Sequence, residues 1–290
     1  MNHLLKLYYG IDEDVTESQY FYYQNQLYFL TPVHDVDAFL QIYQHYRYFT
    51  HISHSPSYQI VQNCHGDMIS DHHILFVYQD KDFDLYQYLD VFLQPLPYQQ
   101  IEVVQIKEQW IHKIDQIKGL VKQYAYSFKH KPELVSLIYY YTGMAENSIS
   151  ILNEILSIHR KASLFVGLSL HHKVSQYVYD VMNPVHYMVS TRMRHIVYLL
   201  KSHTITCETL SHILEDYYFD VYEILYLYAR MFFPSMFFDE VLQGQVNQER
   251  IDYYFFNIES ERELISQMTQ ILSRYVSLPK ISWIQRKNML

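Results

Sequence analysis

Pro95-Leu96-Pro97 decides the fold of this sequence, because the residue patterns on its two sides differ. Before it, short runs rich in aromatic residues alternate with polar turns. After it, apolar residues recur every three to four positions over long segments, which is typical of amphipathic helices. Two prolines so close together interrupt both helices and strands. We therefore expect an α+β fold with two lobes, a small α+β lobe over residues 1–94 and a mainly helical lobe over residues 95–290.

The patterns of the smaller lobe predict two hairpins and two helices. Polar residues 24–26 separate two aromatic-rich runs, and Pro56 opens a second pair of runs around a polar middle, as in β-hairpins. Between the hairpins, apolar residues follow a helical spacing. The expected strands are Ser18–Tyr23, Leu27–Thr31, Tyr58–Gln62 and Ile74–Tyr78, and the expected helices are Asp35–Phe49 and Asp82–Phe92.

The patterns of the larger lobe predict seven helices and one pair of extended runs. Pro132 is a typical first residue of a helix, and Asn183-Pro184 is typical of a turn. We expect helices over Val103–Ser127, Pro132–Ile158 and, after Pro184, about 191–202, 206–217, 219–232, 235–243 and 247–276, with extended runs over Leu164–Leu170 and Tyr177–Met182.

The six glycines exclude several nucleotide-binding and hydrolase motifs, because no two of them are close together. A Rossmann fingerprint, a Walker A loop, a kinase glycine-rich loop and a G-x-S-x-G elbow each need at least two clustered glycines. A nucleotide pocket that does not depend on glycine stays possible.

Charge and composition exclude further classes. The chain has 22 Lys and Arg residues against 31 Asp and Glu residues, a net charge of −9, so we expect no nucleic-acid partner. Cys64 and Cys207 form no disulfide framework and fit a reducing compartment. We expect neither a signal peptide nor a membrane-spanning run, and therefore a soluble protein of cytoplasmic origin.

His65-Gly66-Asp67 is similar to the start of the H-G-D-x-x-x-x-N motif of aminoglycoside and choline phosphotransferases. There the aspartate accepts the substrate hydroxyl proton, and the asparagine helps to hold Mg²⁺. The asparagine position is His72 here, and too few residues precede the motif for a nucleotide-binding lobe. We therefore interpret the segment as a polar hairpin turn.

Histidine and tyrosine are the unusual residue types of the chain, at 17 and 31 copies. The histidine pairs lack the spacing of a zinc site, and adjacent histidines on a strand point to opposite faces. The tyrosine runs have two interpretations: half-buried packing, or a binding face that could become cross-linked by oxidation. The pairs are His51 with His54, His72-His73 and His171-His172, and the runs are Tyr139-Tyr140-Tyr141, Tyr217-Tyr218 and Tyr253-Tyr254.

Four segments resemble a known family. Lys107–Asp115 has the spacing K-x-x-W-x-x-K-I-D, and Tyr139–Ile149 is similar to a Y-Y-x-G-x-A-E-N-A-I segment. Tyr8–Ile11 and Gln26–Val33 resemble the opening of one branch. Together they are similar to endospore coat-associated proteins of the CotS and YutH type. This family resembles the aminoglycoside phosphotransferases, so the resemblance implies a two-lobed, protein-kinase-like fold.

The same resemblance places the kinase landmarks on residues that cannot perform kinase chemistry. Lys173, in His171-His172-Lys173, occupies the catalytic aspartate position, Val178 the metal-binding asparagine position, and Ser190 the second metal-binding aspartate position. The expected strand lysine has no counterpart in Leu27–Val33. Asp180 is the nearest carboxylate that could serve as a shifted ligand. Phosphoryl transfer needs Mg²⁺ and an orienting carboxylate, so we expect no conventional kinase activity.

The resemblance implies a pseudokinase that acts as a structural or interaction component of the bacterial endospore coat, made in the mother cell. We expect no cofactor and no bound metal, and other spore coat proteins as partners. Two alternatives stay open: a small-molecule phosphotransferase with relocated metal ligands, and a regulatory module that binds a nucleotide without turnover. Neither the oligomeric state nor a particular partner follows from the sequence.

Overall fold

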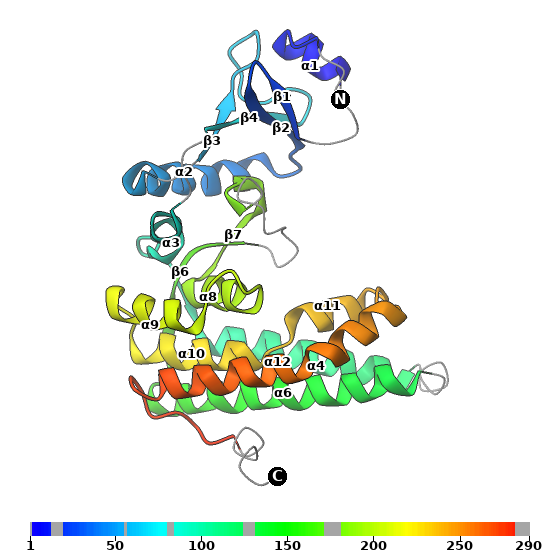
Figure 1. The fold of residues 1–290 in the computed structure, drawn as a ribbon, viewed down its shortest axis with the longest axis vertical. Helices are drawn as coiled ribbons and strands as arrows, with labels where there is room; N and C mark the ends of the chain where they lie inside the picture. Colours follow the sequence, from blue (N-terminus) through cyan, green and yellow to red (C-terminus); the bar gives the residue numbers. More distant parts are fainter. Residues whose placement is uncertain are drawn as a thin grey trace. The chain divides into compact units, whose positions relative to one another are not determined.

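The computed structural model describes residues 2–12, 20–54, 57–79, 84–123, 131–170 and 181–281. The chain divides into two compact units, each described by itself (Figure 1). The first unit combines Met1–Leu96 with Gly167–Arg192, and the second combines Pro97–Val166 with Met193–Leu290. The first boundary between the two units along the chain therefore lies within Pro95-Leu96-Pro97. The architecture is α+β, with a small antiparallel sheet and a helical part.

The first unit contains a four-stranded antiparallel sheet in the order β1-β2-β4-β3. Its strands are β1 (Tyr20–Tyr23), β2 (Gln26–Pro32), β3 (Ser57–Val61) and β4 (His73–Gln79). Gln24 and Asn25 connect β1 to β2 with φ angles of 49° and 62°, as a two-residue type I′ turn requires. Both predicted hairpins are thus confirmed over the described residues.

Helix α2 (Val36–Ser53) covers one face of this sheet. Asp35 caps its start by accepting a hydrogen bond from the Ala38 amide at 3.0 Å. The rings of Phe39 and Tyr43 lie 5.9 Å and 6.0 Å from the ring of Phe76 in β4. The predicted helix is therefore confirmed, and its buried side chains pack against this face of the sheet.

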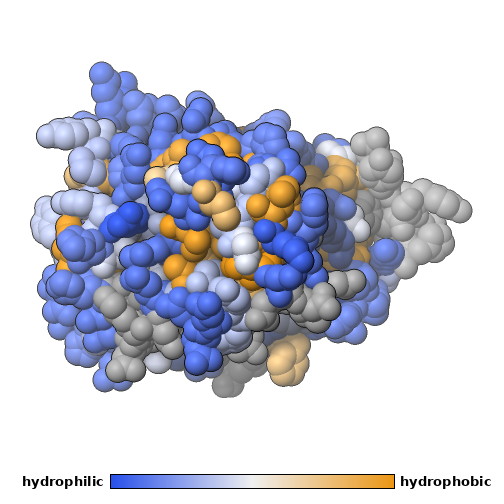
Figure 2. All heavy atoms as spheres, turned by 90° about the horizontal axis from the view of Figure 1, so that it is seen from above, coloured by the Kyte–Doolittle hydropathy of each residue, from blue (hydrophilic) through white to orange (hydrophobic). Residues whose placement is uncertain are grey.

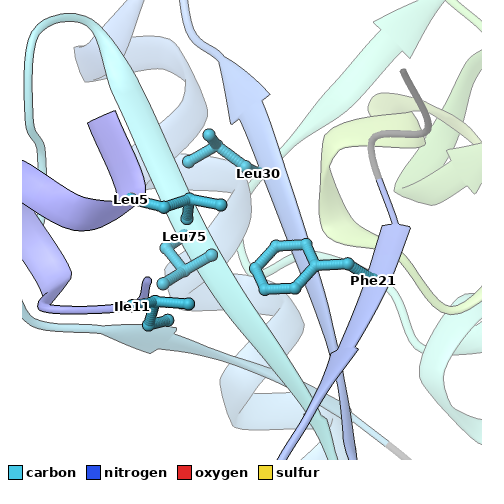
Figure 3. Close-up of a cluster of buried hydrophobic side chains, with 5 residues drawn as sticks. All are labelled: Leu5, Ile11, Phe21, Leu30 and Leu75. Carbon is cyan, nitrogen blue, oxygen red and sulfur yellow. The ribbon is translucent and has the colours of Figure 1, made fainter. Parts of the chain in front are cut away.

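Helix α1 (Asn2–Tyr9) lies against the opposite face of the sheet. Leu30 pairs with Leu75 across the two strands, next to the pair of Phe29 and Phe76. Because adjacent strand residues point to opposite faces, Leu30 and Leu75 point away from α2. The buried cluster there consists of Leu5, Ile11, Phe21, Leu30 and Leu75 (Figure 3). Helix α1 was not predicted from the sequence, because its two turns are too short for a clear periodicity.

The first unit also contains α3 (Leu85–Leu93), the 3₁₀ helix η1 (Pro184–His186) and β7 (Tyr187–Thr191). The prediction of an extended run at Tyr177–Met182 lies mostly outside the described residues, and its last two residues are not in a strand. Asn183 instead caps η1 by accepting from the Val185 amide at 3.1 Å. The strand begins only after this turn.

The second unit consists mainly of helices. Strand β6 (Ser163–Leu170) begins in this unit and ends in the first unit. It belongs to a three-stranded sheet in the order β5-β6-β7, in which it pairs antiparallel with the short β5 (Gln100–Glu102). Helix α6 packs against α4, α10 and α12 (Figure 1). The helices are α4 (Val103–Gln123), α6 (Pro132–Ile158), α8 (Arg192–Lys201), α9 (Cys207–Asp216), α10 (Val221–Phe232), α11 (Ser235–Leu242) and α12 (Gln248–Leu272).

Each of these helices lies where the sequence predicts one, and side-chain caps explain several of the boundaries. Asp220 accepts from the Glu223 amide at 2.8 Å, and Glu223 accepts from the Asp220 amide at 3.3 Å, which forms a capping box at the start of α10. Asn247 caps the start of α12 by accepting a hydrogen bond from the Arg250 amide at 2.9 Å. Within the described ranges, the helices lack the combination of length and apolar character that a membrane span needs.

Candidate functional site

Ser190 is the one kinase-landmark position that falls within the described residues. It is half-buried in β7, ahead of the first residue of α8. The other positions implied by the resemblance, including the substitute ligand Asp180, lie outside the described residues. They are His171, Lys173, Val178 and Asp180. The candidate site is therefore built from the side chains around β7 in the first unit.

Arg192 follows β7 and has a structural role. Its guanidinium is buried, and Nη1 donates a hydrogen bond of 2.9 Å to the carbonyl oxygen of Leu93, the last residue of α3. Carbonyls at a helix C-terminus have no partner within the helix, so this bond satisfies one of them. It also fixes β7 against the segment that leads to Pro95-Leu96-Pro97.

Buried aromatic rings pack on one face of β7, and Ser190 points to the other face, because successive side chains of a strand alternate between its two faces. Tyr187, three residues earlier in β7, lies 5.3 Å from the ring of Tyr46 in α2 and 5.0 Å from the ring of Phe92 in α3. Tyr88 lies 4.6 Å from Phe92, and Tyr58 packs nearby in β3. All five side chains are buried. The region around β7 is thus a packed aromatic cluster, which we call the β7 aromatic cluster.

The hydroxyl groups of this cluster bond to the backbone. The Tyr187 hydroxyl donates to the Val181 carbonyl at 2.9 Å, and the Tyr46 hydroxyl accepts from the Tyr58 amide at 2.8 Å. Burial raises the pKa of both Tyr46 and Tyr187 well above the usual value, so neither ionises near neutral pH. These groups bind the protein's own backbone rather than presenting an anion to a metal ion.

The sheet and α2 lack the charged pair that holds a nucleotide in kinases. There, a strand lysine contacts the phosphates and pairs with a glutamate of the following helix. None of the four strands of the sheet contains a lysine or an arginine, and α2, which follows β2, contains no glutamate. That ion pair cannot form between these elements.

Asn63 organises the loop that contains His65-Gly66-Asp67. Its Oδ1 accepts from the His65 amide at 2.8 Å and from the Asp67 amide at 2.9 Å. Gly66 has a φ of 88°, a conformation that favours glycine. The side chains of His65 and Asp67 are exposed, and the loop joins β3 to β4. The polar turn predicted from the sequence is confirmed.

No metal centre is present among the residues that the structure describes, where no three His, Cys, Asp or Glu side chains come together. His51 lies in the last turn of α2, and His54 ends that helix. His72 lies in the turn before β4. Cys64 is exposed and Cys207 is half-buried, each as a free thiol.

Two of the three tyrosine runs combine buried and exposed members, whereas in Tyr217-Tyr218 the first ring is half-buried and the second exposed. Tyr141 is buried against Phe237 at 4.5 Å, whereas Tyr139 is exposed. Tyr254 is likewise buried, whereas Tyr253 is not. Successive helical residues point about 100° apart, so one run serves both packing and surface. The β7 aromatic cluster could not be predicted from the sequence, because its members come from four separate elements, α2, β3, α3 and β7.

The comparisons with known proteins give no match: no family model, no curated protein and no solved structure matches this chain.

Proposed function

We propose that this chain is a non-catalytic protein with a protein-kinase-like fold, and that it acts as a structural or interaction component of the bacterial endospore coat. The observation that carries the non-catalytic part is that the four strands of the sheet contain no lysine or arginine and that α2 contains no glutamate. The coat assignment rests on the four segments that resemble the CotS and YutH type of protein.

The chemistry around Ser190 opposes phosphoryl transfer. A kinase holds Mg²⁺ with carboxylate and amide oxygens and places charged phosphates beside them. Ser190 supplies a neutral hydroxyl, which cannot replace the negative charge of a metal-binding carboxylate.

The order of elements supports a kinase-like origin. β2 is followed directly by α2, which packs on the same sheet, as the lysine strand and glutamate helix of a kinase do. Strand and helix thus follow each other in the order that a kinase has, whereas β2 contains no lysine and α2 contains no glutamate. A fold that keeps its framework and lacks the ligands of its reaction suits a binding role.

The exposed tyrosines support an interaction role. Tyrosine is enriched at protein interfaces because its ring buries a large area and its hydroxyl can find a partner. Figure 2 shows a face on which hydrophobic side chains lie among hydrophilic ones. Among the described residues, the tyrosines more than 60 % exposed are Tyr22, Tyr48, Tyr98, Tyr139 and Tyr218. We propose other spore coat proteins as the partners.

Thermal melting with nucleotides tests the non-catalytic part. The full chain is melted in millimolar ATP or GTP, first with Mg²⁺ and then with EDTA. A ligand at ~100 times its Kd stabilises by about 2.7 kcal/mol, a shift of a few degrees for a chain of this size. We expect no Mg²⁺-dependent shift. Such a shift would overturn the proposal in favour of a phosphotransferase with relocated ligands, and Asp180→Asn would then be the first variant.

Localisation tests the coat part separately. A fluorescent fusion of the full chain is followed in a sporulating bacterium, and coat extracts of mature spores are probed for the untagged protein. We expect the signal around the developing spore and the protein in the coat extract. A signal that stays in the mother-cell cytoplasm, with none in the coat extract, would reject the coat assignment.

A further inference from the structure

Strand β3 lies at one edge of the four-stranded sheet, so within the described residues one side of its backbone has no neighbouring strand. It consists of Ser57-Tyr58-Gln59-Ile60-Val61, a sequence with no charged residue and no proline. Natural edge strands usually carry charges, prolines or bulges, because an exposed row of amide and carbonyl groups pairs readily with a strand of another molecule. We therefore looked for another form of protection at this edge.

Two tyrosine hydroxyl groups of α2 contact the outer edge of β3. The Tyr46 hydroxyl accepts a hydrogen bond of 2.8 Å from the Tyr58 amide, and the Tyr43 hydroxyl accepts one of 2.9 Å from the Ile60 amide. The Tyr43 hydroxyl also donates to the Tyr58 carbonyl oxygen at a longer 3.4 Å. Two side chains, which we call the α2 tyrosine pair, thus bond three backbone groups of the edge.

These backbone groups face away from β4. In an antiparallel ladder, alternate residues of a strand direct their amide and carbonyl groups toward the same neighbour. Because the Tyr58 and Ile60 amides both bond to α2, the groups of Gln59 between them face β4. The two hydroxyl oxygens therefore occupy the positions that carbonyl oxygens of a further strand would take, at the usual amide–oxygen distance of about 2.9 Å.

Packing fixes both members of the α2 tyrosine pair. Tyr43 and Tyr46 are buried, and their ring centroids lie 6.1 Å apart. The Tyr43 ring also lies 5.8 Å from Phe39, and the Tyr46 ring lies 5.3 Å from Tyr187. Helix residues three positions apart share a face, so α2 directs both hydroxyls to one strand. Groups held in this way bond the edge with little further loss of freedom.

We propose that the α2 tyrosine pair protects the β3 edge and that, without it, β3 pairs with β3 of a second copy of this chain. A second copy fits because the same two residues face outward in both chains. In an antiparallel pair centred on Gln59, Tyr58 of each copy lies opposite Ile60 of the other, and each such pair exchanges its amide and carbonyl hydrogen bonds. This contact has two-fold symmetry and is self-complementary.

This inference is independent of the proposed pseudokinase and coat roles, because it concerns only α2 and β3. The competing explanation is that the two hydroxyls only fasten α2 to the sheet. In that case their removal lowers stability, but the folded variants associate no more than the wild type does. The experiment therefore measures association and its register as well as folding.

Light scattering measures the molar mass of the purified full chain over a range of concentrations. The double variant Tyr43→Leu/Tyr46→Leu removes both hydroxyls and leaves room for a further strand. We expect its mass to rise with concentration from the wild-type value to twice that value, while far-UV circular dichroism confirms that it is folded. The matched control is Tyr48→Leu, at a tyrosine of α2 that is 62 % exposed, and it should keep the wild-type mass.

Residue 59 tests whether the association uses β3. In the proposed register the two copies of Gln59 form a pair without hydrogen bonds, with Cα atoms about 4.5 Å apart, a separation that suits a disulfide. Gln59→Cys in the double variant should therefore form a 59–59 disulfide when oxidised glutathione accepts the two electrons, as peptide mass spectrometry detects. Cys64→Ser removes the exposed natural thiol from every protein in this test. Gln59→Cys without the two leucine substitutions should form no such disulfide.

Gln59→Lys supplies the opposite test. Two lysines directly across from each other repel, so this substitution should return the double variant to the wild-type mass. A folded double variant that keeps the wild-type mass would overturn the proposal. Association that Gln59→Lys leaves unchanged would also overturn it, as would a 59–59 disulfide that forms equally well with the tyrosine pair intact.

Tyr43→Leu alone takes the place of the double variant if the latter does not fold, because Tyr43 makes two of the three hydrogen bonds. The same mass and disulfide measurements then decide. Hydrogen exchange adds a local measurement: the Ile60 amide should exchange about two- to tenfold faster than in the wild type, since it loses one hydrogen bond. The amide of Val77, the β4 partner of Gln59, should keep its rate. Faster exchange at Ile60 without the 59–59 disulfide would leave only the fastening role and would overturn the proposal.

Discussion

Gly167 lies directly against the carbonyl oxygen of Gln94, so close that a Cβ atom at residue 167 would be 3.0 Å from that oxygen. It would also be 3.1 Å from the Phe92 carbonyl and 3.3 Å from Cγ of Arg192. Two of these three neighbours are backbone atoms, which cannot rotate away. The absence of a side chain at residue 167 is therefore what lets β6 approach the end of α3.

Gly167→Ala is expected to destabilise the protein by about 1–3 kcal/mol, because overpacking forces the backbone to shift. Urea unfolding of the purified full chain measures the change. Gly119→Ala is the matched control, since Gly119 is exposed in α4 and has open space around its Cβ position. This control should gain roughly 0.5–1 kcal/mol from helix propensity. Equal effects of the two substitutions would contradict the close approach.

Tyr187→Ala tests the β7 aromatic cluster. Tyr187 is 3 % exposed, and its truncation leaves a cavity beside Tyr46 and Phe92. We expect a loss of about 3–5 kcal/mol, as for other buried aromatic side chains cut to alanine. Tyr139→Ala serves as the comparison, because Tyr139 is 67 % exposed and should change stability by no more than about 0.5 kcal/mol. A loss below 1 kcal/mol for Tyr187→Ala would mean that the cluster is not tightly packed.

Glu240 receives three hydrogen bonds from two side chains. Arg250 donates to its two oxygens at 2.6 Å and 3.0 Å, and the Tyr254 hydroxyl donates at 3.0 Å. Tyr254→Phe is expected to cost about 0.5–1.5 kcal/mol, and Glu240→Ala about 1–3 kcal/mol, because the latter leaves the hydroxyl and the guanidinium without their acceptor. Chemical denaturation measures both. Tyr253→Phe removes the neighbouring, more exposed hydroxyl and should have little effect.

A double-mutant cycle sharpens this test. In a Glu240→Ala background, Tyr254→Phe should cost less than it does in the wild type, because its acceptor is already gone. If the two substitutions had additive effects, the Tyr254 hydroxyl would stabilise the protein through a partner other than Glu240.

Most of the regular elements could be predicted from the sequence because local signals define them. The turn at Gln24 and Asn25, the cap at Asp35 and the capping box at Asp220 are all encoded within a few residues. The strand at β7 could not be predicted, since its position depends on how Asn183 caps η1. Short β5 has no pattern of its own and exists through its pairing with β6.

The candidate site and the helix packing depend on contacts that no spacing encodes. Lys113 and Asp239 are separated by 126 positions, and Arg192 and Leu93 by 99. Folding alone brings such residues together, so a single sequence contains no signal for them. The sequence itself does show which residue types are absent: Leu27–Val33 contains no lysine, and residue 190 is a serine and not an aspartate.

His195 predicts how stability depends on pH. Its imidazole is fully buried in α8, and burial, with a smaller contribution from the Arg194 charge, lowers its pKa to about 3. The unfolded chain binds this proton near pH 6.5, so between about pH 6.5 and 3 the unfolded state holds more protons than the folded state. The stabilising contribution is complete above pH 6.5 and is lost as the pH falls, by at most about 1.4 kcal/mol per pH unit. His195→Gln should therefore flatten the stability profile between pH 6.5 and 4, as measured by urea unfolding at each pH. His112→Gln, an exposed histidine of α4, should keep the wild-type slope. An unchanged slope in His195→Gln would show that other groups cause the acid sensitivity.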